Sequence, residues 1–152
     1  MILNLYHKGE YNLNNFIKIQ KLWRDKEIIQ LKVICSSELI TATAKIYVSD
    51  NLIDELIYQI NRFLEAKVTE SIWSNEFKGD DSSTCVSFRF LHKDKLGHLL
   101  IEVYLEIDDG GRYSKHNCCF YIKTETGLLL KFCENLSQLK SDIDDVSVNL
   151  NV

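Results

Sequence analysis

Residues 98–107 carry the pattern that most constrains how this chain can fold. Apolar side chains occupy every second position from Leu99 to Ile107, while polar and aromatic side chains fill most of the positions between them. Successive side chains of an extended strand point to opposite faces, so this alternation predicts a half-buried β-strand with one face in water. The wet face is a place where a partner could dock.

Similar alternation, rich in β-branched residues, predicts further strands elsewhere in the chain. They cover residues 16–19, 29–35, 40–48, 86–90 and 118–122. The residues Asp108-Asp109-Gly110-Gly111 give a strong hairpin signal between the strand at 98–107 and the next one. Residues 66–84 have no clear period, although Ile72, Trp73 and Phe77 indicate a short strand or a buried turn there.

Two segments have the apolar period of an amphipathic helix. The first covers about residues 51–65, with Ser49 or Asp50 as its N-cap. The second is expected to follow Thr124, which would cap it. The apolar stripe of this second helix consists of Leu129, Phe132, Cys133, Leu136 and Leu139.

These elements predict an α+β protein in which both helices cover one face of a single antiparallel β-sheet. The 152 residues fit one domain. Segments 16–66 and 85–140 share a strand–strand–helix order, which either an internal β–β–α repeat or convergence would explain. The tail, residues 141–152, is expected to be a terminal strand or a frayed acidic end.

Composition and spacing argue against several functions. The formal net charge of −4 disfavours nucleic-acid binding, even though Lys18, Lys21 and Arg24 are expected to form a small basic patch around Trp23. The apolar runs are too short to cross a membrane. The first residues lack the pattern of a signal peptide, and the five cysteines lack CxxC spacing, so we expect a cytoplasmic protein with reduced thiols.

No residue pattern predicts a cofactor, a metal site or catalysis. Cys118 and Cys119 would point to opposite faces of a strand and so could not bind one metal ion together. Glu102 and Glu106 would lie about 13 Å apart along a strand, farther than the roughly 6.5–9.5 Å of a paired carboxylate site. We therefore expect a protein that is not an enzyme.

On a single sheet, the outward side chains of all strands would share one open surface. Tyrosine and arginine are enriched at protein interfaces, so we expect a partner-binding site on this surface. Its candidate contact residues are Tyr47, Arg89, Glu102, Tyr104, Glu106 and Tyr121. An ordinary solvated sheet face would show a similar composition, because tyrosine is also a common strand residue.

The order of these elements resembles that of a known family. A strand leads to a turn with Trp23, then to a strand near Leu31 and a hairpin into a helix; later, Gly97-His98 opens the alternating strand, and residues 121–129 run from a strand straight into a helix. This layout, over about residues 16–139, resembles the WapI-type immunity proteins of bacterial polymorphic-toxin systems. The resemblance implies a protein that binds and neutralises a cognate toxin domain, often a nuclease.

A second hypothesis is a secretion-chaperone-like protein, which would bind extended segments of an effector and dimerise. Such chaperones usually begin with a helix, whereas the predicted strands come first here. A small enzyme, or a small domain of another activity, would need residues of the two halves to converge in a way that the sequence does not reveal. The sequence predicts neither the identity of the partner nor whether the protein is a monomer or a dimer.

Overall fold

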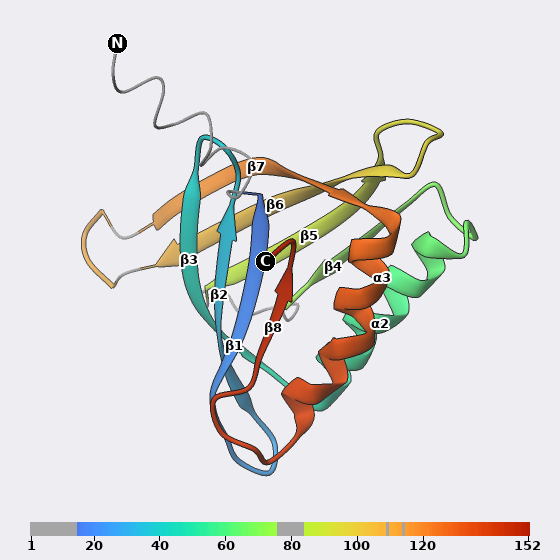
Figure 1. The fold of residues 1–152 in the computed structure, drawn as a ribbon. Coiled ribbons are helices and arrows are strands. Elements are labelled where there is room, and N and C mark those ends of the chain that lie inside the picture. The colour runs from blue at the N-terminus through green and yellow to red at the C-terminus, as the bar shows by residue number, and fades with distance from the viewer. Residues whose placement is uncertain (1–14, 76–83, 109, 114) are drawn as a thin grey trace, which may run out of the picture.

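In the part of the chain that the structure describes, eight strands form two four-stranded antiparallel sheets (Figure 1). The structure is a computed structural model, and it describes residues 15–75, 84–108, 110–113 and 115–152. Two residues used in the sequence-based predictions lie outside these ranges. They are Phe77, which indicated a short strand or a buried turn, and Asp109 of the predicted hairpin turn. The α+β class predicted from the sequence is confirmed.

Sheet B contains four strands that are consecutive in sequence, whereas sheet A combines the first three strands with the last one. Sheet A has the order β3-β2-β1-β8 and consists of β1 (Phe16–Arg24), β2 (Ile29–Ser36), β3 (Thr41–Val48) and β8 (Ser147–Leu150). Sheet B has the order β4-β5-β6-β7 and consists of β4 (Glu70–Ser74), β5 (Cys85–His92), β6 (His98–Asp108) and β7 (Lys115–Glu125).

The helical elements are α2 (Asp50–Leu64), α3 (Thr126–Asn135) and the 3₁₀ helix η2 (Leu136–Lys140). The predicted cap of the first helix is confirmed, because the Ser49 hydroxyl oxygen accepts a hydrogen bond of 3.3 Å from the backbone N–H of Leu52. The predicted cap of the second helix is wrong. Thr124 is buried in β7 and donates its hydroxyl to the side-chain oxygen of Asn151 at 2.9 Å, and α3 begins after Glu125.

The prediction of a single sheet is wrong. The inward side chains of sheets A and B face one another and share one apolar core with the helices. The sheets diverge toward β8 and β4, and the helices fill this opening, with α3 against β8 and α2 against β4 (Figure 1). Alternation along a strand reports that one face is buried, but it does not report whether a helix or a second sheet covers that face.

The two halves of the chain have the same topology. In each, three antiparallel strands lead into a helix and then into a short strand, which joins the sheet of the other half. Thus β4 pairs with β5, and β8 pairs with β1. The two segments that the sequence suggested as a possible repeat, 16–66 and 85–140, therefore stop short of the exchanged strand that ends each half.

Two basic side chains of β1 point toward the end of η2. Lys21 faces inward by the same alternation that buries Ile17 and Ile19. The pairing of β1 with β2 then shifts between Lys21 and Trp23, so that Trp23 faces outward and Arg24 turns inward. The buried Lys21 ammonium donates to the carbonyl of Ser141, and Arg24 donates to the carbonyl of Lys140 at 2.5 Å. These carbonyls carry the partial negative charge of a helix C-terminus, so Lys21 and Arg24 stabilise it rather than forming the predicted surface patch.

The tail is a terminal strand, as one of the two sequence-based alternatives stated. Leu150 is fully buried beside Ile17 of β1, while Val152 is 76% exposed. We expect Leu150→Ala to lower the free energy of unfolding by about 2–5 kcal/mol, because it removes buried apolar contacts and leaves a cavity. Val152→Ala should change it by less than about 0.5 kcal/mol. Chemical denaturation of both variants checks this, and equal losses would show that the tail does not pack on β1.

Candidate functional site

The outer face of sheet B brings together all of the predicted contact residues except Tyr47. Arg89 of β5 lies opposite Glu102 of β6, which lies opposite Tyr121 of β7, so the three form a row across the sheet. The next row contains Tyr104, followed along β6 by Glu106. We call this surface the sheet B face and define it by Arg89, Glu102, Tyr104, Glu106 and Tyr121, with Ile72 at its β4 edge.

Glu102 is the centre of a hydrogen-bonded cluster on this face. Arg89 binds its carboxylate with two N–H groups, at 2.6 Å and 3.2 Å, and the Tyr121 hydroxyl donates to the same carboxylate at 2.6 Å. Arg89 also reaches Glu70 of β4 at 3.3 Å. The cluster therefore ties β4, β5, β6 and β7 together through side chains on their solvent-facing side.

A second contact continues the face toward the far end of β6. The Tyr104 hydroxyl donates to Glu106 at 3.0 Å. Ile72, which is 59% exposed, lies opposite Arg89 on β4 and adds an apolar side chain. The face thus combines two hydrogen-bonded tyrosines, a bidentate arginine–carboxylate pair and an exposed aliphatic group.

The protonation behaviour of the cluster argues against acid–base chemistry there. The hydrogen bonds from Arg89, and then from Tyr121, lower the pKa of Glu102 below its ordinary value of 4.5. The same hydrogen bond to Glu102 raises the pKa of Tyr121. A general base or acid near neutral pH needs a pKa near that pH. These shifts move both groups away from it and leave a fixed, charged carboxylate.

Tyr47 lies elsewhere, on the outer face of sheet A. Its ring meets that of Trp23 with 6.3 Å between the ring centroids, and its hydroxyl accepts a hydrogen bond of 3.3 Å from Gln30. The expectation that Tyr47 shares one surface with Arg89 and Tyr121 is therefore wrong. It assumed one sheet, whereas β3 and β7 belong to different sheets.

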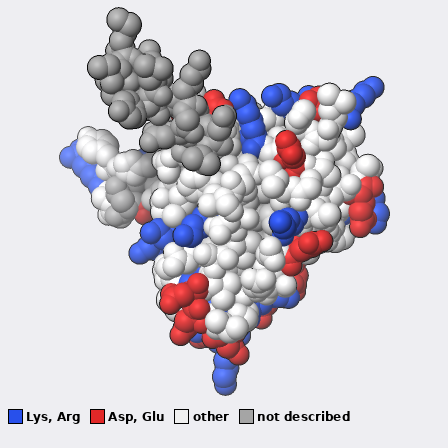
Figure 2. Space-filling view, in the orientation of Figure 1, with Lys and Arg blue, Asp and Glu red and all other residues white. Residues whose placement is uncertain are grey.

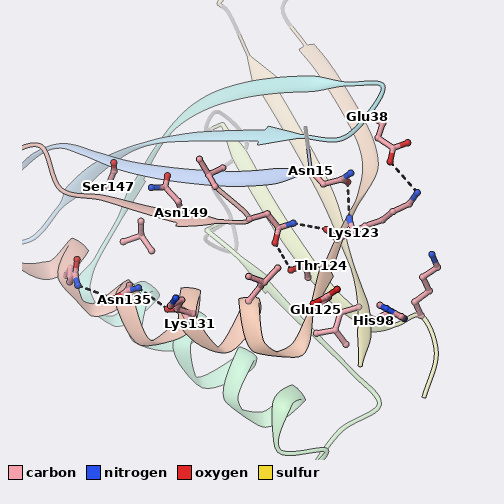
Figure 3. Close-up of a pocket in the computed structure, with 17 residues that line it drawn as sticks. Asn15, Glu38, His98, Lys123, Thr124, Glu125, Lys131, Asn135, Ser147 and Asn149 are labelled. Atoms are coloured by element: carbon pink, nitrogen blue, oxygen red, sulfur yellow. Dashed lines mark hydrogen bonds and ion pairs between the residues drawn. The ribbon is translucent and has the colours of Figure 1, made fainter. Parts of the chain in front are cut away.

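A polar groove of about 860 Å³ lies between β8, α3 and the end of β7 (Figure 3). One wall carries Lys131, Asn135 and Gln138 from the helical segment, and the other is the edge of β8. The side chain of Asn151, which lines the groove, accepts a hydrogen bond from Thr124 and donates one to the carbonyl of Lys123 at 2.8 Å. These two hydrogen bonds join the tail of the chain to β7 of sheet B.

The sequence did not reveal this groove, because it exists only where the tail folds back onto α3 and the end of β7. Asn151 adopts a positive φ of 66°, a conformation in which asparagine is enriched, and this places its side chain against β7. The two asparagines near the end of the sequence, Asn149 and Asn151, are the only signal that could have pointed to it.

Within the described ranges, no group of three or more His, Cys, Asp or Glu side chains is arranged to hold a metal ion. No helix of the described residues is long and apolar enough to cross a membrane. The ring nitrogen Nδ1 of His98 lies 2.6 Å from the carboxylate of Asp94.

Comparison of the chain with protein-family models, with curated proteins and with solved structures finds no match.

The cluster predicts how Glu102 titrates. In Arg89→Gln the pKa of Glu102 should rise toward its ordinary value, and in Tyr121→Phe it should rise less, because Arg89 is the larger cause of the shift. An NMR titration of the side-chain carboxyl carbon measures both. Unchanged titration in Arg89→Gln would show that the two side chains are not paired in solution.

The same shift gives the stability a pH dependence of known sign. Because the pKa of Glu102 is lower in the folded state, its stabilising effect is present above the ordinary pKa and is lost as the pH falls through the folded value. Glu102→Gln should therefore destabilise the protein more near neutral pH than below about pH 4. Urea denaturation at both pH values checks this, and an equal effect at both would contradict it.

Proposed function

We propose that this chain is a binding protein without catalytic activity, that it docks a partner protein on the sheet B face, and that the partner is a toxin domain that it neutralises. The choice of this face as the docking site is supported by one observation, the hydrogen-bonded cluster of Arg89, Glu102 and Tyr121 beside Tyr104 and Ile72. The identity of the partner as a toxin domain rests on the resemblance to WapI-type immunity proteins.

The mutual hydrogen bonds of the face favour tight binding. Arg89, Tyr121 and Tyr104 are held by Glu102 and Glu106 without any partner, so little side-chain entropy remains to be lost when a partner docks. Tyrosine and arginine are also the residue types that supply most of the binding free energy at protein interfaces. The five residues thus form a preorganised patch.

Charge narrows the choice of partner. Carboxylates outnumber cationic side chains on the outward positions of sheet B. The carboxylates are Glu70, Glu102, Glu106, Asp108 and Glu125, and the cationic side chains are Arg89, Lys115 and Lys123. An acidic patch complements a basic one and speeds association with it. Domains that act on nucleic acids carry such basic surfaces, which agrees with a nuclease-type toxin as the partner.

The double variant Tyr104→Ala/Tyr121→Ala tests this surface. We expect it to weaken partner binding by at least about 2 kcal/mol, or roughly 30-fold in Kd, because two aromatic anchors are removed. The tagged chain is first used to isolate a partner from its source cells. Titration calorimetry then compares the wild type with the variant. Wild-type affinity in the double variant would exclude the sheet B face.

The matched control is Tyr47→Ala/Tyr58→Ala. These tyrosines are 52% and 55% exposed, and they lie on β3 and α2, away from sheet B. This variant should bind like the wild type. For the toxin hypothesis, expression of the isolated partner should arrest growth, and co-expression of the wild type, but not of Tyr104→Ala/Tyr121→Ala, should restore it. A partner that does not arrest growth would contradict neutralisation while leaving the docking surface intact.

The groove beside β8 favours a second candidate, a chaperone-like protein that holds an extended segment. The backbone N–H of Lys21 donates to the carbonyl of Val146. In an antiparallel pair, every second residue of a strand bonds to its neighbour, so the backbone N–H and C=O groups of Ser147 and Asn149 point away from β1 and toward the groove. An extended peptide could add to this edge as a further strand. Binding that is lost in Asn149→Pro and kept in Tyr104→Ala/Tyr121→Ala would favour this candidate.

A further inference from the structure

The outer face of sheet A differs in chemistry from that of sheet B. Its outward positions on β1, β2 and β3 are cationic, aromatic, amide, hydroxyl or aliphatic, and none of them is a carboxylate. We call this surface the sheet A face and define it by Lys18, Trp23, Gln30, Lys32, Lys45 and Tyr47. It occurs in a chain whose net charge is −4.

Two aromatic rings stand at one end of the sheet A face. Trp23 on β1 and Tyr47 on β3 are 42% and 52% exposed, and their rings meet edge to face at 6.3 Å. Gln30 of β2 lies between them in the same row and bonds to the Tyr47 hydroxyl. The bulge in β1 is what turns Trp23 outward into this row.

Three lysines occupy the rest of the face. Lys32 and Lys45 lie directly opposite one another on β2 and β3, an arrangement of like charges that destabilises a sheet. Within the residues that the structure describes, neither these two nor Lys18 forms an ion pair. In Figure 2, lysine and arginine side chains lie over β2 and β3, and acidic side chains gather toward the lower end of the molecule.

Two carboxylates, one in the turn after β1 and one at the start of α2, are engaged with their own surroundings. Asp25 accepts hydrogen bonds of 2.8 Å from the N–H groups of Glu27 and Ile28, and Asp50 pairs with Arg24 at 3.2 Å. They therefore do not neutralise the lysines on the sheet. Uncompensated like charges beside exposed rings are the features of a surface that receives an anionic, aromatic ligand.

We propose that the sheet A face binds single-stranded nucleic acid. Proteins that bind single strands combine aromatic side chains, on which bases stack, with cationic groups that follow the phosphates. Sheet faces with exposed aromatics are one of the common platforms for this. Here Trp23 and Tyr47 offer the ring surfaces, Gln30 offers an amide to a base edge, and Lys18, Lys32 and Lys45 face the backbone of the strand.

The expectation against nucleic acid came from the charge of the whole chain, which averages over two faces of opposite character. The fold separates them, because β1–β3 and β5–β7 lie in different sheets. This inference does not depend on the proposed function, since the two surfaces share no residue. If nucleic-acid binding by the sheet A face fails its test, partner binding by the sheet B face is still tested by its own variants, and the reverse also holds.

The first test is binding of a fluorescently labelled oligothymidylate of about 12 nucleotides, measured by anisotropy between about 50 and 200 mM salt. Three lysine–phosphate contacts predict a slope of log K against log salt of about −2, and Lys32→Gln/Lys45→Gln should reduce its magnitude by about 1.4. The matched control, Lys93→Gln/Lys131→Gln, removes two lysines that line the groove beside β8 and should keep the wild-type slope.

The second test reports on stacking. Trp23 is exposed and Trp73 is only 4% exposed, so the oligonucleotide should quench the tryptophan fluorescence of the wild type but not that of Trp23→Leu. Trp23→Leu and Tyr47→Leu should each weaken binding on the order of tenfold without changing the salt slope. Circular dichroism and the melting temperature show that each variant is folded.

Three results would overturn the proposal. The first is no binding at the lowest salt. The second is equally tight binding of inorganic polyphosphate with the same charge, together with no effect of Trp23→Leu, which would make the face a general anion site. The third is loss of binding only in Lys93→Gln/Lys131→Gln, which would place the oligonucleotide in the groove.

Discussion

The exchange of β4 and β8 is the constraint on which the rest of the structure depends. Each sheet takes its fourth strand from the other half of the chain, and each helix connects a sheet to the strand that leaves it. The helices therefore lie between β4 and β8. There they cover the core on the side where the two sheets diverge. One core results, since apolar side chains from both halves belong to a single cluster.

The same topology gives the molecule two outward sheet faces that occupy equivalent places and have opposite chemistry. At corresponding positions on the second and third strands of each half, sheet A has Lys32 opposite Lys45, whereas sheet B has Glu102 opposite Tyr121. The inward residues of both sheets are mainly apolar, because they share one core, and Lys21 and Thr124 are exceptions at its margin. Packing in the core thus constrains the residue types at the inward positions of each strand, while the residue types at the outward positions can differ between the two sheets.

Alternation and capping in the sequence predicted most of the elements, including the strand at 98–107 and the helix after Ser49. They could not predict how the strands were divided between sheets, because the side-chain pattern of β3 is the same whether a helix or β5 covers its inner face. The bulge at Lys21 also escaped prediction, since strict alternation would have turned Trp23 inward. The groove depends on contacts between Asn151 and β7, which are distant in sequence and which no local pattern reports.

Each half of the chain carries a strand that its own sheet cannot use. A polypeptide made of the first half alone would have β4 without a neighbour and β1 with an open edge. Two copies could satisfy both needs by lending β4 to one another's β1, which is the arrangement of a two-fold domain-swapped dimer. The present fold is equivalent to such a dimer with its subunits joined end to end, and this linkage allows the two faces to specialise without losing their common frame.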